Sequence, residues 1–221
     1  MKVLVFGATG MVGQGVLMES LRDPDVELVA TIGRTATGVH NSKLKEIIHT
    51  DFNEYTSIAS QLTGLDACFF CLGVSSAGMT EAGYRRITYD FTLAAAEELS
   101  RVNPGMTFLY VSGAGTDSSE HGRTMWARVK GQTENALLRL PLSAYMFRPG
   151  VIVPLDGIRS KTRAYRILYS ILGPLLPLLR HMFPKSVVTT REIGLAMLSV
   201  ARHGYGKRIL EVADIRSVVP V

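Results

Sequence analysis

The sequence is poor in cysteine, which excludes a disulfide-stabilised scaffold and a zinc-organised domain. Its 221 residues include two cysteines, Cys68 and Cys71, both in the apolar run CFFC. Residues i and i+3 of a strand face opposite sides, so these thiols are not expected to bridge or to share a metal. No second Cys or His cluster completes a metal site. We interpret both as small buried apolar residues, and disulfide-free usage predicts a cytoplasmic location.

We expect no targeting segment, and the sequence shows neither an internal repeat nor a strong charge imbalance. The opening MKVLVFGATG has one Lys and a short apolar run, which fits a first strand better than a signal peptide. The formal net charge of +5 requires no nucleic-acid partner, and none is expected. With 47% hydrophobic residues the chain can bury a core, and its length predicts one domain over residues 1–221.

Strand-like and helix-like segments alternate along most of the chain. Apolar runs predict strands at 2–6, 27–32, 47–50, 66–70, 106–112, 143–147 and 208–212. Helical periodicity predicts helices near 11–21, 80–102, 123–138 and 190–202. Strands without polar alternation are typical of a parallel sheet covered on both faces. The fold class is therefore predicted to be α/β, a doubly wound parallel sheet of Rossmann type with strand order 3-2-1-4-5-6 plus an edge strand.

Three glycines follow the first predicted strand and open the first helix. Gly7, Gly10 and Gly13 form the pattern G-x-x-G-x-x-G. Such glycines allow a tight turn and a close backbone approach, and the free N–H groups of the helix end then face a pyrophosphate. A glycine triplet alone is weak evidence, but the strand-turn-helix context predicts a dinucleotide site. The residues between the glycines that complete this predicted site are Thr9, Met11 and Val12.

No carboxylate ends the second predicted strand, where an NAD site needs one for the ribose 2′-hydroxyl. The strand runs instead into Gly33, Arg34 and Thr35. The Arg34 guanidinium suits a ribose 2′-phosphate, although a solvated surface arginine is the alternative. We therefore predict NADP(H) as the cofactor, in preference to NAD, with Thr35 beside it.

Two further groups of residues are expected to border the cofactor. Asp51 and Phe52 follow the third strand and could border the adenine, although Asp51 could equally cap the start of a helix. Cys71, Leu72 and Gly73 end the fourth strand beside the point where the strand order reverses, where backbone must lie close to the cofactor. We expect a side chain at position 73 to crowd the ribose.

Several motifs together resemble the atypical short-chain dehydrogenase/reductase family. They are GATGMVG, CFFCLG, VSGAG, WARVKGQTE and FRPG. The similarity is strongest to the branch that includes the HIV Tat-interacting protein and NmrA-like sensor proteins. It implies a Rossmann sheet with a small C-terminal substrate lobe. By the same resemblance, Lys130 matches the lysine that bonds the nicotinamide ribose and Ser112 the active-site serine, which makes both candidate catalytic residues. Pro149 and Gly150 match the turn beside the nicotinamide.

The chain departs from this family where a tyrosine should precede Lys130 by four residues. Trp126 stands there, and an indole N–H is not acidic at any relevant pH. Proton donation contributes about 100- to 10,000-fold to such reactions, so its loss would cripple reduction or epimerisation. His121 or Tyr84 could replace the tyrosine only by reaching the cleft, which nothing in the sequence indicates.

Three functions follow as hypotheses. The first is an NADP(H)-binding protein that acts as a redox sensor or regulator, with a protein partner. The second is an NADP-dependent oxidoreductase or sugar-nucleotide epimerase for an apolar or nucleotide-linked substrate. The third is a membrane-surface or complex-assembly factor that keeps the cofactor as a structural element.

Residues 151–190 are predicted to form an apolar and basic lid within the C-terminal part. The run ILYSILGPLLPLL, Ile167–Leu179, has 13 uncharged residues, fewer than the ~20 needed to span a bilayer. Its interpretations are a lid over an apolar substrate pocket, a homodimer contact and a peripheral membrane anchor.

Overall fold

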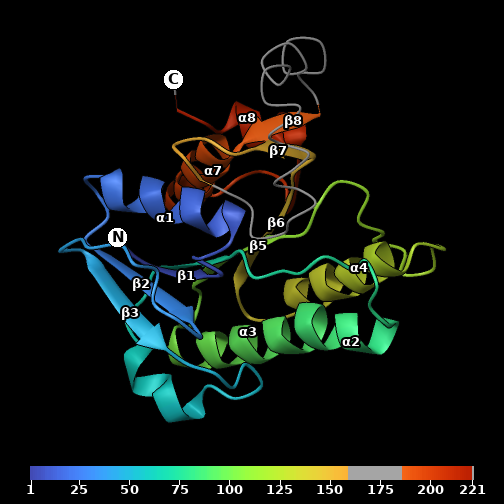
Figure 1. The fold of residues 1–221 in the computed structure, drawn as a ribbon, viewed down its shortest axis with the longest axis horizontal. Helices are drawn as coiled ribbons and strands as arrows, with labels where there is room; N and C mark the ends of the chain where they lie inside the picture. Colours follow the sequence, from blue (N-terminus) through green and yellow to red (C-terminus); the bar gives the residue numbers. More distant parts are fainter. Residues whose placement is uncertain (159–185, 221) are drawn as a thin grey trace.

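A computed structural model describes residues 1–158 and 186–220, and its centre is a seven-stranded parallel sheet (Figure 1). The strand order is β3-β2-β1-β4-β5-β6-β9. The strands are β1 (Lys2–Phe6), β2 (Leu28–Gly33), β3 (Leu44–Ile48), β4 (Ala67–Phe70), β5 (Thr107–Val111), β6 (Ser143–Arg148) and β9 (Ile209–Glu211). This order confirms the predicted doubly wound sheet and its additional edge strand, β9, which pairs in parallel with β6.

Helices cover both faces of the sheet, as Figure 1 shows. On one face α1 (Met11–Arg22) packs against α7 (Thr190–His203), and α8 (Val212–Ser217) follows β9. On the other face lie α2 (Glu81–Arg85), α3 (Phe91–Val102) and α4 (Met125–Leu138). The core is accordingly divided into two clusters of buried residues, one on each side of the strands.

The two cysteines show this division directly. Cys68 is fully buried in the cluster on the α3 and α4 side, whereas Cys71 packs against the cluster on the α1 and α7 side. Both thiols are free. Burial raises the pKa of each thiol, which makes both poor nucleophiles. The sequence-based interpretation of these cysteines as small buried residues on opposite faces is confirmed.

The third strand was predicted at 47–50, and this position is wrong. The strand β3 runs from Leu44 to Ile48, paired in parallel with Val29 to Gly33 of β2. It lies at the edge of the sheet, so Lys45 and the half-exposed Ile48 can face solvent. The prediction followed apolar residues alone, and an edge strand does not require a continuous apolar run.

The long helix predicted at 80–102 is present from Glu81 to Val102, and a π-helical segment lies within it. This segment, η2 (Arg86–Asp90), joins α2 to α3 without a break, because the residues at both junctions keep helical backbone angles. Three short elements had no sequence signal, because three to six residues carry little measurable periodicity. One is the 3₁₀ helix η1 (Thr56–Gln61). The others are the strands β7 (Val151–Val153) and β8 (Val187–Thr189), which pair in parallel as a second sheet.

The predicted lid falls only partly within the described residues. Its ends form β7 and β8, while positions 159–185, including the run Ile167–Leu179, lie outside what the structure describes. Across 1–158 and 186–220, no helix has the length and apolar character to cross a membrane.

Candidate functional site

The turn between β1 and α1 is built from backbone contacts that only glycine permits. Gly7 has a φ of +72°, and a Cβ there would lie 2.7 Å from the Cys71 carbonyl oxygen at the end of β4. A Cβ on Gly13 would lie 2.1 Å from the Gly7 carbonyl oxygen, so α1 sits directly on the turn. Gly10 precedes the first residue of α1, and its added Cβ would meet only the Gly7 oxygen, at 3.2 Å. The turn therefore leaves room outside Gly10, next to the N–H groups that begin α1.

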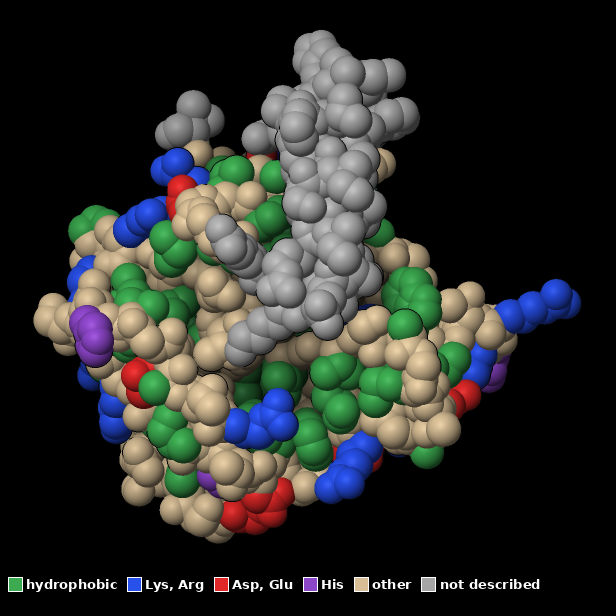
Figure 2. Space-filling model, viewed as in Figure 1, with side chains coloured by type: hydrophobic (Ala, Val, Ile, Leu, Met, Phe, Trp, Pro, Cys, Tyr) green, Lys and Arg blue, Asp and Glu red, His purple; other side chains and the backbone are tan. Residues whose placement is uncertain are grey.

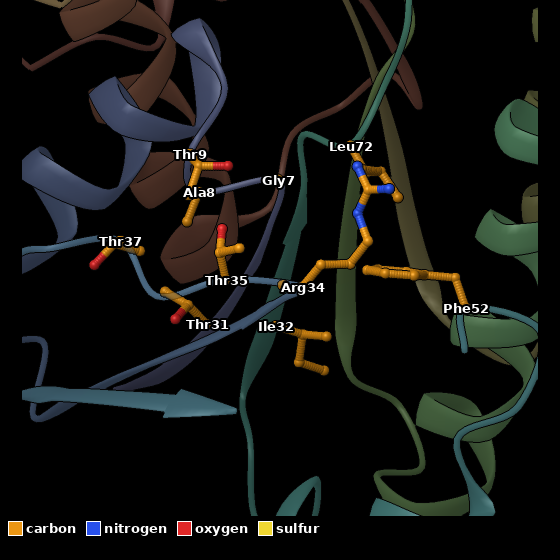
Figure 3. Close-up of a pocket in the computed structure, with 11 residues that line it drawn as sticks. Gly7, Ala8, Thr9, Thr31, Ile32, Arg34, Thr35, Thr37, Phe52 and Leu72 are labelled. Atoms are coloured by element: carbon orange, nitrogen blue, oxygen red, sulfur yellow. The ribbon is translucent and has the colours of Figure 1, made fainter. Parts of the chain in front are cut away.

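The first cavity, here called the Arg34 cavity, lies between this turn and the end of β2. Its volume is about 300 Å³. In Figure 3 the hydroxyl-bearing Thr9, Thr35 and Thr37 border one side, and Arg34 and Phe52 the other. The lining residues are Gly7, Ala8, Thr9, Thr31, Ile32, Gly33, Arg34, Thr35, Thr37, Phe52 and Leu72. Arg34 is the one charged residue in this lining, and none of the lining residues is acidic.

The second cavity, here called the Lys130 cavity, has a volume of about 460 Å³ and lies across the ends of β4, β5 and β6. Most of its wall is apolar, and Lys130 is its one basic residue. The lining residues are Gly10, Met11, Val12, Cys71, Leu72, Gly73, Val74, Ser75, Val111, Ser112, Gly113, Ala114, Lys130, Pro149, Gly150 and Ile152. Figure 2 shows a hollow near the centre of one molecular face, with hydrophobic side chains inside it and a basic side chain at its rim.

The structure therefore brings together almost all of the predicted site residues, from segments far apart in the sequence. The two cavities meet at Leu72, which lines both. Gly13 and Asp51 are the exceptions, because they line neither cavity, and Gly13 instead lies against the Gly7 backbone. The exposed carboxylate of Asp51 accepts hydrogen bonds from the backbone and side-chain nitrogens of Asn53, at 3.0 and 2.8 Å. This contact closes a local turn, so no contact of Asp51 points to the adenine that the sequence suggested.

Two predicted glycines differ in what the protein itself demands of them. A Cβ on Gly73 would meet no protein atom within 4 Å, so the expectation that a side chain there would crowd the ribose stays a prediction. A Cβ on Gly150 would lie 2.3 Å from the Ser186 carbonyl oxygen. Gly150 therefore permits the chain after residue 186 to approach the start of β7, whatever occupies the Lys130 cavity.

Lys130 is held at the wall of its cavity by a backbone contact. Its Nζ donates a hydrogen bond to the carbonyl oxygen of Ser112, and it lies 5.8 Å from the centre of the Tyr110 ring. Burial lowers the pKa of Lys130 to about 8, although the Glu134 carboxylate acts in the opposite direction. Near neutral pH this amine exchanges protons far more readily than an exposed lysine.

This shift predicts an unusual pH dependence of stability. The pKa of Lys130 is lower in the folded chain, about 8, than its ordinary value of 10.5. Below pH 8 both states carry the proton, and between about 8 and 10.5 only the unfolded chain does. The contribution of Lys130 to the free energy of unfolding should therefore rise with pH in that window.

Denaturant unfolding of the wild type and of Lys130→Met from pH 7.5 to 10 measures this contribution. The wild type should gain stability relative to the variant as the pH rises. Lys45→Met, at an exposed position of β3, serves as the control and should give a curve parallel to the wild type. A constant difference between wild type and Lys130→Met would contradict the prediction.

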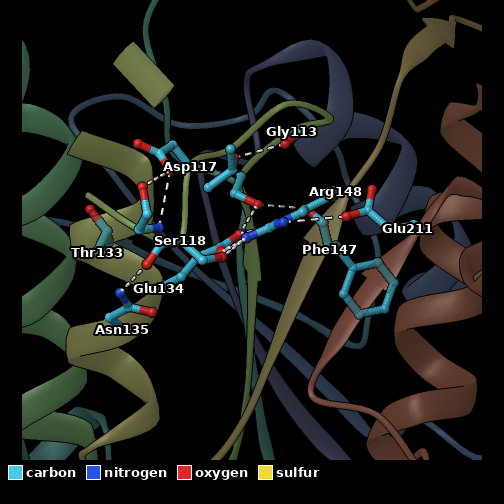
Figure 4. A network of polar contacts seen from close by, with 12 residues as sticks. Gly113, Asp117, Ser118, Thr133, Glu134, Asn135, Phe147, Arg148 and Glu211 are labelled. Carbon is cyan, nitrogen blue, oxygen red and sulfur yellow. Dashed lines mark hydrogen bonds and ion pairs between the residues drawn. The ribbon is translucent and has the colours of Figure 1, made fainter. Parts of the chain in front are cut away.

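Behind the Lys130 cavity lies a buried ionic network, shown in Figure 4. The Glu134 carboxylate, from α4, is fully buried and accepts hydrogen bonds from Nε and Nη2 of Arg148, at the end of β6. Arg148 also donates to Ser118 Oγ at 2.5 Å and to Glu211 at 3.3 Å. Burial opposes the charge of Arg148, but Glu134 and Glu211 outweigh it and raise the pKa of the guanidinium.

Ser112 faces this network with its hydroxyl. Its Oγ lies 2.5 Å from Glu134 Oε1 and 3.2 Å from the Phe147 carbonyl oxygen, and the side chain is buried. The single hydroxyl proton is therefore already engaged with acceptors inside the protein. The role of active-site serine, which the family resemblance implied, stays a prediction.

Sequence reasoning missed this network although both partners lie in motifs that it singled out. Glu134 is the last residue of VKGQTE, and Arg148 is the second residue of FRPG. A possible signal was the spacing of Glu134 four residues after Lys130, which places both on one face of α4. Nothing in the sequence placed Arg148 opposite that face.

The residues considered as proton donors lie outside the Lys130 cavity lining. Trp126 is half-buried, and its ring packs close to Gly115. A Cβ added to Gly115 would lie 3.6 Å from the Trp126 ring, in ordinary van der Waals contact. Tyr84 is buried, with a pKa raised by burial, and His121 is exposed. In the described parts of the chain, no group of three or more His, Cys, Asp or Glu could hold a metal ion.

Comparisons of the sequence identify relatives but no matching family model. The chain is 29% identical over 169 residues to a mitochondrial fmp52 protein of Emericella nidulans, which covers 73% of this chain and 70% of that protein. It is 29% identical over 156 residues to the HTATIP2 protein of Rattus norvegicus, which covers 68% of this chain and 62% of that protein. The match to the rat protein thus spans less than two thirds of its length.

Solved structures with the same fold include nucleotide-sugar enzymes. A UDP-N-acetylglucosamine 4-epimerase from Methanobrevibacter ruminantium superposes with a TM-score of 0.69 at 14% identity, covering 92% of this chain and 74% of that one. The enzyme WbmF of Bordetella bronchiseptica, in complex with NAD+, gives a TM-score of 0.67 at 14% identity, covering 98% and 76%. At this identity the likeness concerns the fold.

The relatives found by sequence also correct one prediction. A cytoplasmic location is wrong as an inference from cysteine usage, because the fungal relatives are named as mitochondrial proteins. Reduced cysteines are equally compatible with several compartments, so cysteine usage cannot distinguish among them. The resemblance drawn from the motifs is confirmed: Fmp52 and HTATIP2 proteins, of the atypical short-chain dehydrogenase/reductase type, are homologues of this chain, and it has the Rossmann fold of that type.

Proposed function

We propose that the chain binds NADP(H) along the carboxyl ends of its parallel strands. The adenosine half would occupy the Arg34 cavity, and the nicotinamide half the Lys130 cavity. The β1–α1 turn lies between the halves, where its glycines let a pyrophosphate approach the first N–H groups of α1. WbmF and MoeE5, which have the same fold and were solved in complexes with NAD+ or NAD, support the choice of a nicotinamide dinucleotide.

The observation that carries the preference for NADP(H) is the charge of the Arg34 cavity. Its lining holds the Arg34 guanidinium and four threonines, but no carboxylate. A carboxylate would bond a ribose 2′-hydroxyl and repel a 2′-phosphate, whereas a guanidinium binds the phosphate with charge-assisted hydrogen bonds. No hydrogen bond or ion pair to Arg34 is found among the described residues, so its donors remain available for a ligand.

Replacing Arg34 by Asp should therefore reverse the nucleotide preference. We expect the affinity for NADPH to fall by about 100-fold, the value of two charge-assisted hydrogen bonds, while NADH binding stays the same or improves. Titration calorimetry with both nucleotides measures the ratio of the NADPH and NADH affinities. Arg139→Asp, at the end of α4 and outside both cavities, is the matched control. Equal losses for NADPH and NADH would overturn the assignment.

We further propose that the bound cofactor serves a sensing or regulatory role. This proposal rests on which groups in the Lys130 cavity could transfer a proton. The described lining of that cavity contains no tyrosine or histidine. The Cys71 thiol in that lining is a poor acid because burial raises its pKa. A carbonyl held there would meet only Lys130 and the exposed Ser75 hydroxyl as side-chain donors in addition to the engaged Ser112.

Turnover measurements separate this role from the enzymatic alternatives. The sensor proposal expects NADPH to bind with no steady oxidation across a broad panel of aldehydes and ketones. It also expects no interconversion of UDP-sugars, the class of compound named with two solved structures of this fold. Steady carbonyl-dependent oxidation would establish an oxidoreductase, and epimerisation of a UDP-sugar would establish an epimerase. Either result would overturn the sensor proposal while leaving cofactor binding intact.

A further inference from the structure

Ser112 contacts three different elements of the site through three different atoms. Its backbone N–H donates to the Phe147 carbonyl at 2.9 Å, which extends the β5–β6 pairing. Its hydroxyl faces the Glu134 carboxylate at 2.5 Å. Its carbonyl oxygen accepts the hydrogen bond from Lys130 Nζ. One residue thus joins the buried carboxylate to the ammonium group at the cavity wall.

The carboxylate end of this link is fixed on both oxygens. Glu134 Oε1 accepts from Ser112 Oγ and from Arg148 Nε, and Oε2 accepts from Arg148 Nη2 (Figure 4). A carboxylate held in the fork of a guanidinium has little rotational freedom. Both groups are nine-tenths or more buried, so solvent does not loosen the contact.

The lysine end has no comparable partner of its own. Among the described residues, no carboxylate lies within ion-pair distance of Nζ, and the groups that face it are the Tyr110 ring from β5, Glu134 from its own helix and the Cys71 thiol across the cavity. Its orientation therefore depends on the Ser112 carbonyl. A lysine has four rotatable side-chain bonds, and one fixed acceptor restricts them strongly.

We propose that Glu134 and Arg148 are positioning residues for Lys130, and that the Ser112 hydroxyl links them to it rather than contacting a substrate. The positioning would aim Lys130 at the nicotinamide ribose, and this part of the inference rests on the proposed function. The positioning itself is a property of the nucleotide-free protein, so it can be tested without any cofactor.

The test is the rate at which acetic anhydride acetylates Lys130 in the nucleotide-free chain at pH 6, well below the pKa of about 8, followed by mass spectrometry. Lys45, exposed on β3, provides the internal standard in the same sample. Ser112→Ala removes the hydroxyl contact with Glu134 but keeps the carbonyl that accepts from Lys130. Glu134 is then held less firmly toward Lys130, and its favourable influence on the ammonium form weakens. We expect the acetylation rate of Lys130 to rise about fivefold, which corresponds to a fall of roughly 0.7 in its pKa.

Two further variants separate positioning from simple stabilisation. Ser112→Thr keeps the hydroxyl and should restore a rate within about twofold of the wild type, a shift of roughly 0.3 pKa unit. The double variant Glu134→Gln with Arg148→Met removes both charges together, which preserves folding better than either single change. The proposal expects Lys130 to react about fivefold faster in this folded double variant.

The outcomes distinguish the two proposals. Unchanged acetylation in Ser112→Ala and in the folded double variant would overturn the positioning role and leave the network as structural only. Protection of Lys130 by added NADPH is measured separately in the wild type. Absence of protection would count against the proposed cofactor site, whatever the variants show.

Discussion

Replacing Glu134 by Gln is expected to lower the free energy of unfolding by about 3 kcal/mol, because it leaves the buried Arg148 without its main counter-charge. Glu134 is fully buried and Arg148 is 9% exposed. Glu211 remains within 3.3 Å of Arg148, but it is half-exposed and offers a weaker, solvent-screened partner. Urea unfolding followed by circular dichroism measures the loss.

The matched control is the double variant in which Arg148 is also replaced by Met. Removing both charges avoids an unpaired buried ion, so the double variant should recover to within about 1 kcal/mol of the wild type. The coupling between the two positions is then read from the cycle of four proteins. If Glu134→Gln alone unfolds within about 1 kcal/mol of the wild type, Glu134 is not the main counter-charge of the buried Arg148.

Replacing Gly13 by Ala is expected to have a comparably large effect, through the backbone rather than through charge. The new Cβ would lie 2.1 Å from the Gly7 carbonyl oxygen and 2.6 Å from its carbon, both backbone atoms that cannot rotate away. Helix α1 must then move off the turn. We expect a loss of about 3 kcal/mol of unfolding free energy, at the upper end for overpacked sites. Nucleotide binding should be lost with it, because the turn and the start of α1 form one surface.

Gly10→Ala is the matched control, three residues away in the same motif. Its added Cβ meets only one atom, at 3.2 Å, so the cost in stability should stay below about 1 kcal/mol. Gly10 does line the Lys130 cavity, and a methyl group there would stand where the pyrophosphate is proposed to approach. The affinity for NADPH should fall more than about tenfold. The interpretation fails if Gly10→Ala binds NADPH as well as the wild type does.

Features determined by short sequence patterns could be predicted, and the glycine turn is the main example. Its spacing specifies a local contact between β1 and α1, and the structure shows the Gly7 and Gly13 contacts directly. The strand order followed from the alternation of strands and helices, because parallel connections are nearly always right-handed. The gathering of the ends of β2, β4, β5 and β6 at two cavities followed in turn.

Features that depend on register between distant elements could not be predicted. Whether Glu134 faces Arg148 depends on the rotation of α4 relative to β6, which no local pattern specifies. The direction of the Ser112 hydroxyl depends on the same contact. Asp51 shows a different limit, because a carboxylate after a strand can close a turn as readily as it can face a ligand. Gly150 shows that the same residue can satisfy a motif for a reason unrelated to the ligand.

The meeting of the two cavities at Leu72 has a consequence for how ligands would be recognised. A dinucleotide that spans both cavities would behave as two weak ligands joined by a short, fairly stiff linker. The second half then binds at the high effective concentration set by the first, and the pair binds far more tightly than either fragment alone. Adenosine 2′,5′-bisphosphate and nicotinamide mononucleotide would each sample one half of this divided site. The Arg34 side would discriminate between cofactors, and the Lys130 side would report their redox state.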